Sequence, residues 1–258
     1  MNTKIFLASI KCVKNIIIPN YKPYCVLESF MNLRPKTKTT EDFMKWCLSA
    51  DEFLLDSGAF SFMNKSKKSS NFTDETLKKY IDDYIDFINT YNIKNFFEMD
   101  IDCIIGYDRV KEIRHYIEEK TGKKVIPVWH ITRGIEDFHD MCKKYKYVAI
   151  GGIASREIKP SQHNILFELC DIAHSYGCKI HGLGYLSLTV LNERKCPFDT
   201  VDGTSWQGHI RGYYYALNNG KLEKIKDDRN WREQDRDSYV AWTEFSKLPD
   251  VCQEQINN

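Results

Sequence analysis

The chain has 258 residues, of which 42% are hydrophobic and 28% charged, so it is long enough for one large core and falls in the size range of a single α/β barrel. Its formal net charge of +1 provides no overall attraction for nucleic acid, so such a partner must be held by local patches. No run approaches the roughly 18 to 20 apolar residues of a membrane helix, so we expect no membrane partner.

Nine cysteines are scattered singly along the chain, and none forms a Cys-x-x-Cys pair. An odd number without paired spacing is typical of reduced, buried thiols. The seven histidines show no metal-ligand spacing. The first apolar run is interrupted by Lys11 and Lys14 and is expected to be a strand, not a signal peptide. The sequence therefore predicts a cytoplasmic protein with no metal and no cofactor.

Short apolar, β-branched or aromatic runs alternate with amphipathic stretches, which is the pattern of parallel strands joined by crossover helices. The expected strands are IFLASI, CVLESF, EFLLD, NFFEMD, VIPVW, YVAIGG, KIHGLG and FDTVD, beginning at residues 5, 25, 52, 95, 125, 147, 179 and 198. Eight such runs in a chain of this length favour a closed (β/α)8 TIM-type barrel over an open doubly wound sheet.

Amphipathic stretches between the runs are expected to be helices. The clearest covers 73–91, where Thr73 is a good N-terminal cap and Asp74 and Glu75 lie in the first turn. From about residue 218 the sequence becomes polar and strongly charged, and we expect a helical tail on a single domain that spans 1–258. The remaining expected helices are 108–120, 134–144, 160–176 and 206–217.

Acidic residues and glycines occur where the expected strands stop, which is the end at which barrel enzymes place their sites. Asp56 ends the third run, Asp100 and Asp102 follow the fourth, and glycines end the sixth and seventh. A strand-end Asp alone is commonly a helix cap, and a Gly pair is commonly a tight turn. Several such ends around one barrel indicate a binding site, because acidic groups leaving an apolar strand need donors or a ligand.

Five of these segments resemble motifs of the tRNA-guanine transglycosylase superfamily, in the family's order. LLDSGAFSF is similar to its DSGGFQ-type motif, FFEMDID to its strand that ends in a substrate-reading Asp, AIGGIAS to its GGLA-type loop and HGLG to its MGVG-type loop. FDTVDGTSW resembles the FDCV-type segment that carries the nucleophilic Asp. The matches span 56–206, and the resemblance implies a (β/α)8 barrel enzyme that exchanges a guanine-type base on a sugar.

The resemblance also implies a role for each matching residue. Asp199 is then the nucleophile on the sugar C1′, and Asp56 is the general acid/base. Asp100 reads the donor edge of the base, with Asp102 as its rival. Phe60 stacks on one face of the base and His181, where the family usually has Met, on the other. The expected substrate-binding set also includes Ser57, Gly58, His130, Gly151, Gly152, Ile153, Gly182, Gly184 and Asp202.

The residue types also suit base exchange on chemical grounds that do not depend on the resemblance. Exchange with retention needs a double displacement, in which a carboxylate traps the oxocarbenium-like sugar before a second base attacks it. A second carboxylate with a tuned pKa suits the transfer of a proton to the departing base and from the incoming one. A guanine edge presents two hydrogen-bond donors. An ionised carboxylate such as that of Asp100 only accepts hydrogen bonds, so it matches this edge.

The chain departs from the family in two ways. The family's CxCxxC zinc signature with a later His is absent, so we expect no zinc subdomain, and Trp129 and His130 stand where the family has Gln. A short, zinc-less chain with VDGTSW is more similar to the phage and bacterial enzymes that exchange guanine in DNA for a 7-deazaguanine. Such an enzyme must extrude its target base, and the aromatic residues available to hold it are Phe60, Trp129, His181 and Trp206.

The expected partners are DNA in preference to tRNA, a free 7-deazaguanine such as preQ0 or preQ1, and, as family members often dimerise, a second copy of the chain. One alternative is the tRNA-guanine transglycosylase itself, acting on tRNA. An alternative of another class is a non-catalytic barrel that binds a base or nucleic acid. An unrelated barrel whose glycine loops hold a phosphate does not explain three Asp residues at its mouth.

Overall fold

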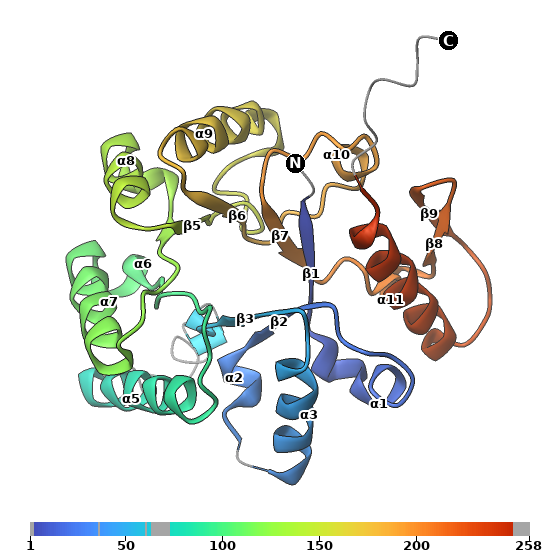
Figure 1. Cartoon of the computed structure of the whole chain (residues 1–258), viewed down its shortest axis with the longest axis horizontal. Helices are drawn as coiled ribbons and strands as arrows, with labels where there is room; N and C mark the ends of the chain where they lie inside the picture. Colours follow the sequence, from blue (N-terminus) through green and yellow to red (C-terminus); the bar gives the residue numbers. More distant parts are fainter. Residues whose placement is uncertain (1–2, 36, 60, 63–72, 250–258) are drawn as a thin grey trace.

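The computed structural model describes residues 3–35, 37–59, 61–62 and 73–249. At its centre is a seven-stranded parallel sheet with the strand order β3-β2-β1-β7-β6-β5-β4. The sheet curls, and the helices surround it (Figure 1). This confirms the expected α/β class with a parallel sheet. The strands are β1 (Lys4–Ala8), β2 (Cys25–Ser29), β3 (Glu52–Asp56), β4 (Val128–Trp129), β5 (Tyr147–Ile150), β6 (Lys179–Gly182) and β7 (Thr200–Gly203).

Helical segments connect the strands on the outside, because parallel neighbours need a crossover. The α-helices are α1 (Lys14–Ile17), α2 (Phe30–Leu33), α3 (Lys38–Leu48), α5 (Asp74–Thr90), α6 (Asp102–Ile105), α7 (Tyr107–Thr121), α8 (Ile135–Lys144), α9 (Asn164–Ser175) and α10 (Leu188–Asn192). Short 3-10 turns are η1 (Ile10–Val13), η2 (Ile131–Arg133), η3 (Pro160–Gln162) and η4 (Gly208–Arg211). Within the described residues, no helix is both long and apolar enough to cross a membrane.

The segment between α5 and α6 connects the two edges of the sheet. Phe96 pairs with Leu55 of β3, and Phe97 pairs with Ile126, which precedes β4, each as an isolated parallel bridge. The Phe97 amide donates to the Leu55 carbonyl at 3.0 Å, and the Glu98 amide donates to the Ile126 carbonyl at 3.1 Å. The expected strand NFFEMD is therefore a short bridging segment, whereas the other seven expected runs form strands.

Alternation along the strands divides the core in two. Ile5 and Leu7 of β1 belong to the large cluster between sheet and helices, whereas Phe6 and Ala8 belong to a smaller cluster. Phe97, from the bridging segment, also belongs to this smaller cluster. Successive side chains of a strand point to opposite faces, so the smaller cluster occupies the inner face of the curled sheet. It forms the floor under the carboxyl ends of the strands.

Most expected helices are confirmed. Thr73 caps α5 by accepting a hydrogen bond from the Thr76 amide at 3.1 Å. The stretches 108–120, 134–144 and 160–176 correspond to α7, to α8, and to η3 with α9. The expected helix 206–217 is wrong, because the chain forms η4 and then a strand. Gly212 has a φ of 70° after η4, a left-handed conformation that ends the turn.

The segment after residue 218, expected as a polar helical tail, completes an antiparallel hairpin and then forms a helix. Strand β8 (Tyr214–Asn218) pairs with β9 (Lys221–Ile225), and α11 (Trp231–Lys247) follows. Helix α11 buries Tyr239, Trp242 and Phe245 in the large cluster, at helical spacing. The Ile5 amide of β1 donates to the Ser246 hydroxyl at 3.2 Å. The helix therefore contributes to the core beside β1.

Trp242→Ala should lower the free energy of unfolding by about 3–5 kcal/mol, because the indole is fully buried against Tyr215 and Phe245. Trp231→Ala, at the start of the same helix, should cost less than about 1 kcal/mol because that side chain is 45% exposed. Urea unfolding followed by far-UV circular dichroism measures both. Equal small losses would show that α11 is dispensable to the core.

Candidate functional site

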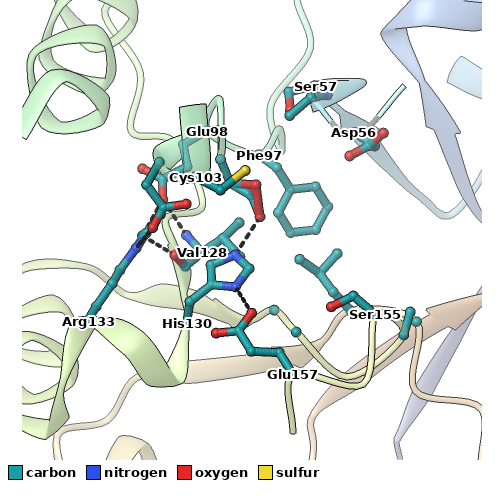
Figure 2. Close-up of a pocket in the computed structure, with 18 of the residues that line it drawn as sticks. Asp56, Ser57, Phe97, Glu98, Cys103, Val128, His130, Arg133, Ser155 and Glu157 are labelled. Carbon is teal, nitrogen blue, oxygen red and sulfur yellow. Dashed lines mark hydrogen bonds and ion pairs between the residues drawn. The ribbon is translucent and has the colours of Figure 1, made fainter. Parts of the chain in front are cut away.

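A cavity of about 1190 Å³ lies at the carboxyl ends of the strands. Residues that end or follow β3, β4, β5 and β6 line it, together with Asp202 within β7 and residues of the bridging segment. Figure 2 shows several of these side chains directed toward one another. The expected site residues that line this pocket are Asp56, Ser57, Asp100, Asp102, His130, Gly151, Gly152, Gly184 and Asp202.

Asp56 is the last residue of β3 and accepts a hydrogen bond from the Gly58 amide at 3.1 Å. Burial, together with the smaller effects of the nearby Asp100 and Asp202 charges, raises the pKa of Asp56 to about 6, although the hydrogen bonds from Ser29 and Gly58 oppose the shift. Gly58 has a φ of 74°, and a Cβ there would lie 2.6 Å from the Tyr80 hydroxyl. Glycine is therefore required at the turn that positions Asp56.

His130 lies between two carboxylates. Its Nε2 is 2.8 Å from Asp100 Oδ2 and its Nδ1 is 2.9 Å from Glu157 Oε2 (Figure 2). Burial alone would lower the pKa of His130, but the hydrogen bonds and charges of the two acids raise it to about 9. Burial raises the pKa of Asp100, and the contact with His130 opposes that shift. At neutral pH His130 is therefore a cation that donates both N–H groups to protein carboxylates.

The two glycines after β5 leave room for this group. A Cβ on Gly151 would lie 2.7 Å from the His130 ring, and a Cβ on Gly152 would lie 2.8 Å from Glu157 Oε2. Gly152 also has a φ of 78°, which favours glycine. The Gly-Gly pair, expected to be part of the substrate-binding set, is needed to make room for the His130 and Glu157 side chains.

Asp202 is the third residue of β7 and lines the pocket. Its Oδ1 accepts a hydrogen bond from the Gly184 amide at 2.7 Å and lies 3.2 Å from His181 Nε2. Its Oδ2 accepts no hydrogen bond from any residue that the structure describes. One carboxylate oxygen is thus anchored, and the other is available to a ligand.

Asp199 lies at the opposite end of β7, outside the pocket. Its Oδ2 accepts hydrogen bonds from the Ile180 amide at 2.7 Å and from His174 Nε2 at 3.0 Å. Asp202 follows Asp199 by three positions, which is about 10 Å along a strand, and an odd offset places the two side chains on opposite faces of the sheet. The expectation that Asp199 shares the strand-end site with Asp56 is therefore wrong, and Asp202 takes that place.

Other expected ligand contacts lie outside the pocket lining as well. His181 is fully buried beneath Asp202, within 5.3 Å of the Phe97 ring centroid, and offers no face to a base in the pocket. Ile153 is part of the large core cluster, and a Cβ on Gly182 would meet the Phe198 ring at 2.9 Å. Gly58 acts through the Asp56 turn, and Phe60 lies outside the described residues.

The tryptophans expected to hold an extruded base are core residues. Trp129 is 2% exposed, and its Nε1 donates to the Gly134 carbonyl at 2.8 Å. Trp206 is fully buried, and its Nε1 donates to the Ala8 carbonyl at the end of β1 at 2.9 Å. Both indoles therefore secure loops at the pocket rim instead of lining the pocket.

A charged network that sequence reasoning missed forms one wall. Glu98 is fully buried and accepts hydrogen bonds from Arg114 Nε at 2.5 Å, Arg133 Nη1 at 3.1 Å and the Val128 amide at 2.8 Å. Arg133 Nε also donates to Asp102 Oδ2 at 3.0 Å. Burial would raise the pKa of Asp102, but Arg133 outweighs this effect and lowers it. Asp102 is thus paired with the Arg133 cation, as Asp100 is with the His130 cation.

For one of the missed residues, Glu98, a signal was present in the sequence. Glu98 interrupts an apolar run, and an acid within a buried strand needs cationic partners. Glu157 lies in the loop after β5, five residues beyond Gly152, and only its contact with His130 reveals its place. Within the described part of the chain, no group of three or more His, Cys, Asp or Glu side chains is arranged to hold a metal ion.

No protein-family model and no curated protein matches the chain. The site is therefore interpreted from its own geometry.

His130→Gln should reveal the contribution of the imidazolium to stability. The folded pKa of His130 is raised from 6.5 to about 9, so its stabilisation is complete below pH about 6.5 and is lost as the pH rises through about 9. The difference in free energy of unfolding between wild type and variant should shrink over that interval. Urea unfolding at several pH values measures it, and a constant difference would contradict the charged state of His130.

Proposed function

We propose that this protein is a base-exchanging transglycosylase that replaces guanine in DNA by a 7-deazaguanine through a covalent Asp–sugar intermediate. The observation that carries the proposal is the convergence of Asp56, Asp100 and Asp202 on one pocket from separate parts of the sheet. The ordered motif resemblance over 56–206 supplies the reaction class.

Asp202 is the proposed nucleophile, in place of Asp199. Its Oδ2 attacks the sugar C1′, the bond from C1′ to the base nitrogen breaks, and the electron pair leaves with the base. The incoming base then attacks C1′ from the opposite side and breaks the bond to Oδ2, so the original configuration returns. The resemblance to the nucleophile segment then belongs to DGTSW, three residues after the position expected from sequence.

Asp56 is the proposed proton-transfer group. The departing guanine needs a proton and the incoming base must lose one, so the same carboxyl group can serve both half-reactions. A pKa of about 6 places Asp56 near the pH at which each form is present. Burial and the two neighbouring acids account for that tuning.

The charge of the pocket favours a base with hydrogen-bond donors over a phosphate. Asp56, Asp100, Glu157 and Asp202 contribute acceptor oxygens, and the His130 cation that faces two of them already donates both N–H groups. Guanine and its 7-deaza analogues present N1–H and an exocyclic amine to such acceptors. A phosphate would meet repulsion in the same place, which argues against the phosphate-binding alternative.

The proposal also includes the closure of the barrel and the identity of the nucleic acid and the free base. We infer a (β/α)8 barrel in which the bridging segment 96–97 is the eighth strand, because it pairs with residues of both sheet edges. DNA is proposed in preference to tRNA, with preQ0 or preQ1 as the free base. A homodimer and a cytoplasmic location remain predictions from the sequence.

A base-exchange assay tests the function. Purified protein is incubated with duplex DNA or tRNA that carries labelled guanine, together with free 7-deazaguanines, and label release and nucleoside composition are followed. Release from DNA with incorporation of the deazaguanine supports the proposal, and release from tRNA alone favours the tRNA enzyme. Binding of the free base without release from either nucleic acid favours a non-catalytic barrel.

Asp202→Asn should reduce guanine release by at least about 10³-fold, because an amide is a poor nucleophile toward C1′. Asp199→Asn is the matched control on the same strand and should retain release within about threefold, because it faces His174 at the opposite end. Single-turnover release by folded protein measures both. Loss in Asp199→Asn with normal rates in Asp202→Asn would restore the assignment made from sequence.

Guanine release should fall as the pH rises through about 6. In this half-reaction Asp56 donates a proton, so only its protonated form is active, and that form is lost above its pKa. Asp56→Asn should release guanine slowly and without this pH limb. Single-turnover rates between about pH 5 and 8 measure the effect, and an unchanged limb in the variant would assign it to another group.

A further inference from the structure

A line of hydrogen bonds leads from Asp202 into the interior of the sheet. His181 Nε2 is 3.2 Å from Asp202 Oδ1, and His181 Nδ1 is 2.7 Å from Thr200 Oγ1. Thr200 Oγ1 is in turn 2.6 Å from the Tyr147 hydroxyl. These groups come from the adjacent strands β5, β6 and β7, and both His181 and Thr200 are fully buried.

The chemistry of these groups determines which atom donates and which accepts in each hydrogen bond. An ionised Asp202 only accepts, so His181 Nε2 carries the hydrogen and donates it. Nδ1 is then an acceptor, which the Thr200 hydroxyl fills by donating to it. Thr200 Oγ1 accepts in turn from the Tyr147 hydroxyl, whose pKa is raised by burial, so that it stays a donor. Each donor in this line therefore has an acceptor. Thr200 and Tyr147, the residues farthest from Asp202, select the tautomer of His181.

The aromatic neighbours of His181 do not by themselves require a polar side chain. The rings of Phe6 and Phe97 pack against it, with centroids at 6.2 Å and 5.3 Å. A polar ring in such a place is costly unless all its groups are bonded. An apolar side chain of similar length would fill the space between the rings, but it would not contact Asp202 Oδ1 and the Thr200 hydroxyl as the imidazole does.

We propose that His181 is a positioning residue for Asp202, a role that rests on the proposed function. His181 and the Gly184 amide together hold Oδ1, so Oδ2 is the oxygen directed at the sugar. When the bond between C1′ and Oδ2 breaks in the second half-reaction, the returning negative charge is shared with Oδ1. The two donors stabilise it there, which makes the carboxylate a better leaving group. Thr200 and Tyr147 act through His181.

His181→Met, His181→Gln and Thr200→Val test this role. His181→Met keeps the bulk and removes the donor, so kcat for exchange should fall on the order of 10- to 100-fold while KM for the free base changes less than about twofold. His181→Gln restores an N–H near the Nε2 position and should recover most of the rate. Thr200→Val removes the nearer donor to Nδ1 and leaves the Tyr147 hydroxyl at 3.5 Å, so it should show a smaller loss of kcat. Equal kcat per folded molecule in all three would overturn the proposal.

Nitrogen-15 NMR of the imidazole provides a readout that does not depend on turnover. In the wild type, His181 Nε2 should be protonated and Nδ1 should be an acceptor, and Asp202→Asn should shift the Nε2 resonance. A bare Nε2 would overturn the proposal whatever the activity. Absence of guanine release by the wild type would refute the proposed function, and the imidazole spectrum would still decide whether His181 anchors Asp202. If His181→Met does not fold, the comparison of Thr200→Val and His181→Gln with the wild type decides the kinetic question.

Discussion

The pairing of β7 between β1 and β6 determines where the acids of the last strand point. Asp202 lies opposite Phe6 of β1, while Thr200 lies opposite His181 of β6. Because side chains alternate along a strand, this register sends Thr200 and Asp202 into the curled sheet and Asp199 out toward α9. A shift of one residue would exchange these sets, so the hydrophobic packing that fixes the register also fixes the chemistry of the pocket.

The second constraint is repulsion between acids that share one cavity. The protein relieves it differently for each group. Asp56 has a raised pKa, Asp100 bonds to the His130 cation, Asp102 bonds to Arg133, and Asp202 is anchored by Gly184 and His181. Carboxyl groups in distinct environments can hold distinct roles at one pH, which is what nucleophilic attack, proton transfer and base reading require together.

Turns at glycines and contacts between segments far apart in the sequence both shape the rim of this cavity. The Gly58 turn and the glycine pair after β5 give the backbone conformations that Asp56 and the His130 group need. Trp206 binds the loop after β7 to the end of β1, and α11 packs beside β1. The stretch 206–217 has an amphipathic pattern, yet it forms η4 and β8, since pairing with β9 and packing on α11 satisfy its backbone and Tyr215. Tertiary contacts here outweigh local propensity.

The sequence by itself determined which runs along the chain form strands, which residue caps α5, and that Asp56 and Asp100 lie where strand-like runs end. These features depend on periodicity and on neighbours in the chain. Only the tertiary structure decided that Asp202 lines the pocket while Asp199 does not, that His130 bonds to Glu157, and that Arg133 neutralises Asp102. Each of those outcomes depends on a register or contact between segments on separate elements. Local sequence patterns carry no information about the distance between side chains on separate elements, because only the folded chain brings these groups within hydrogen-bonding range.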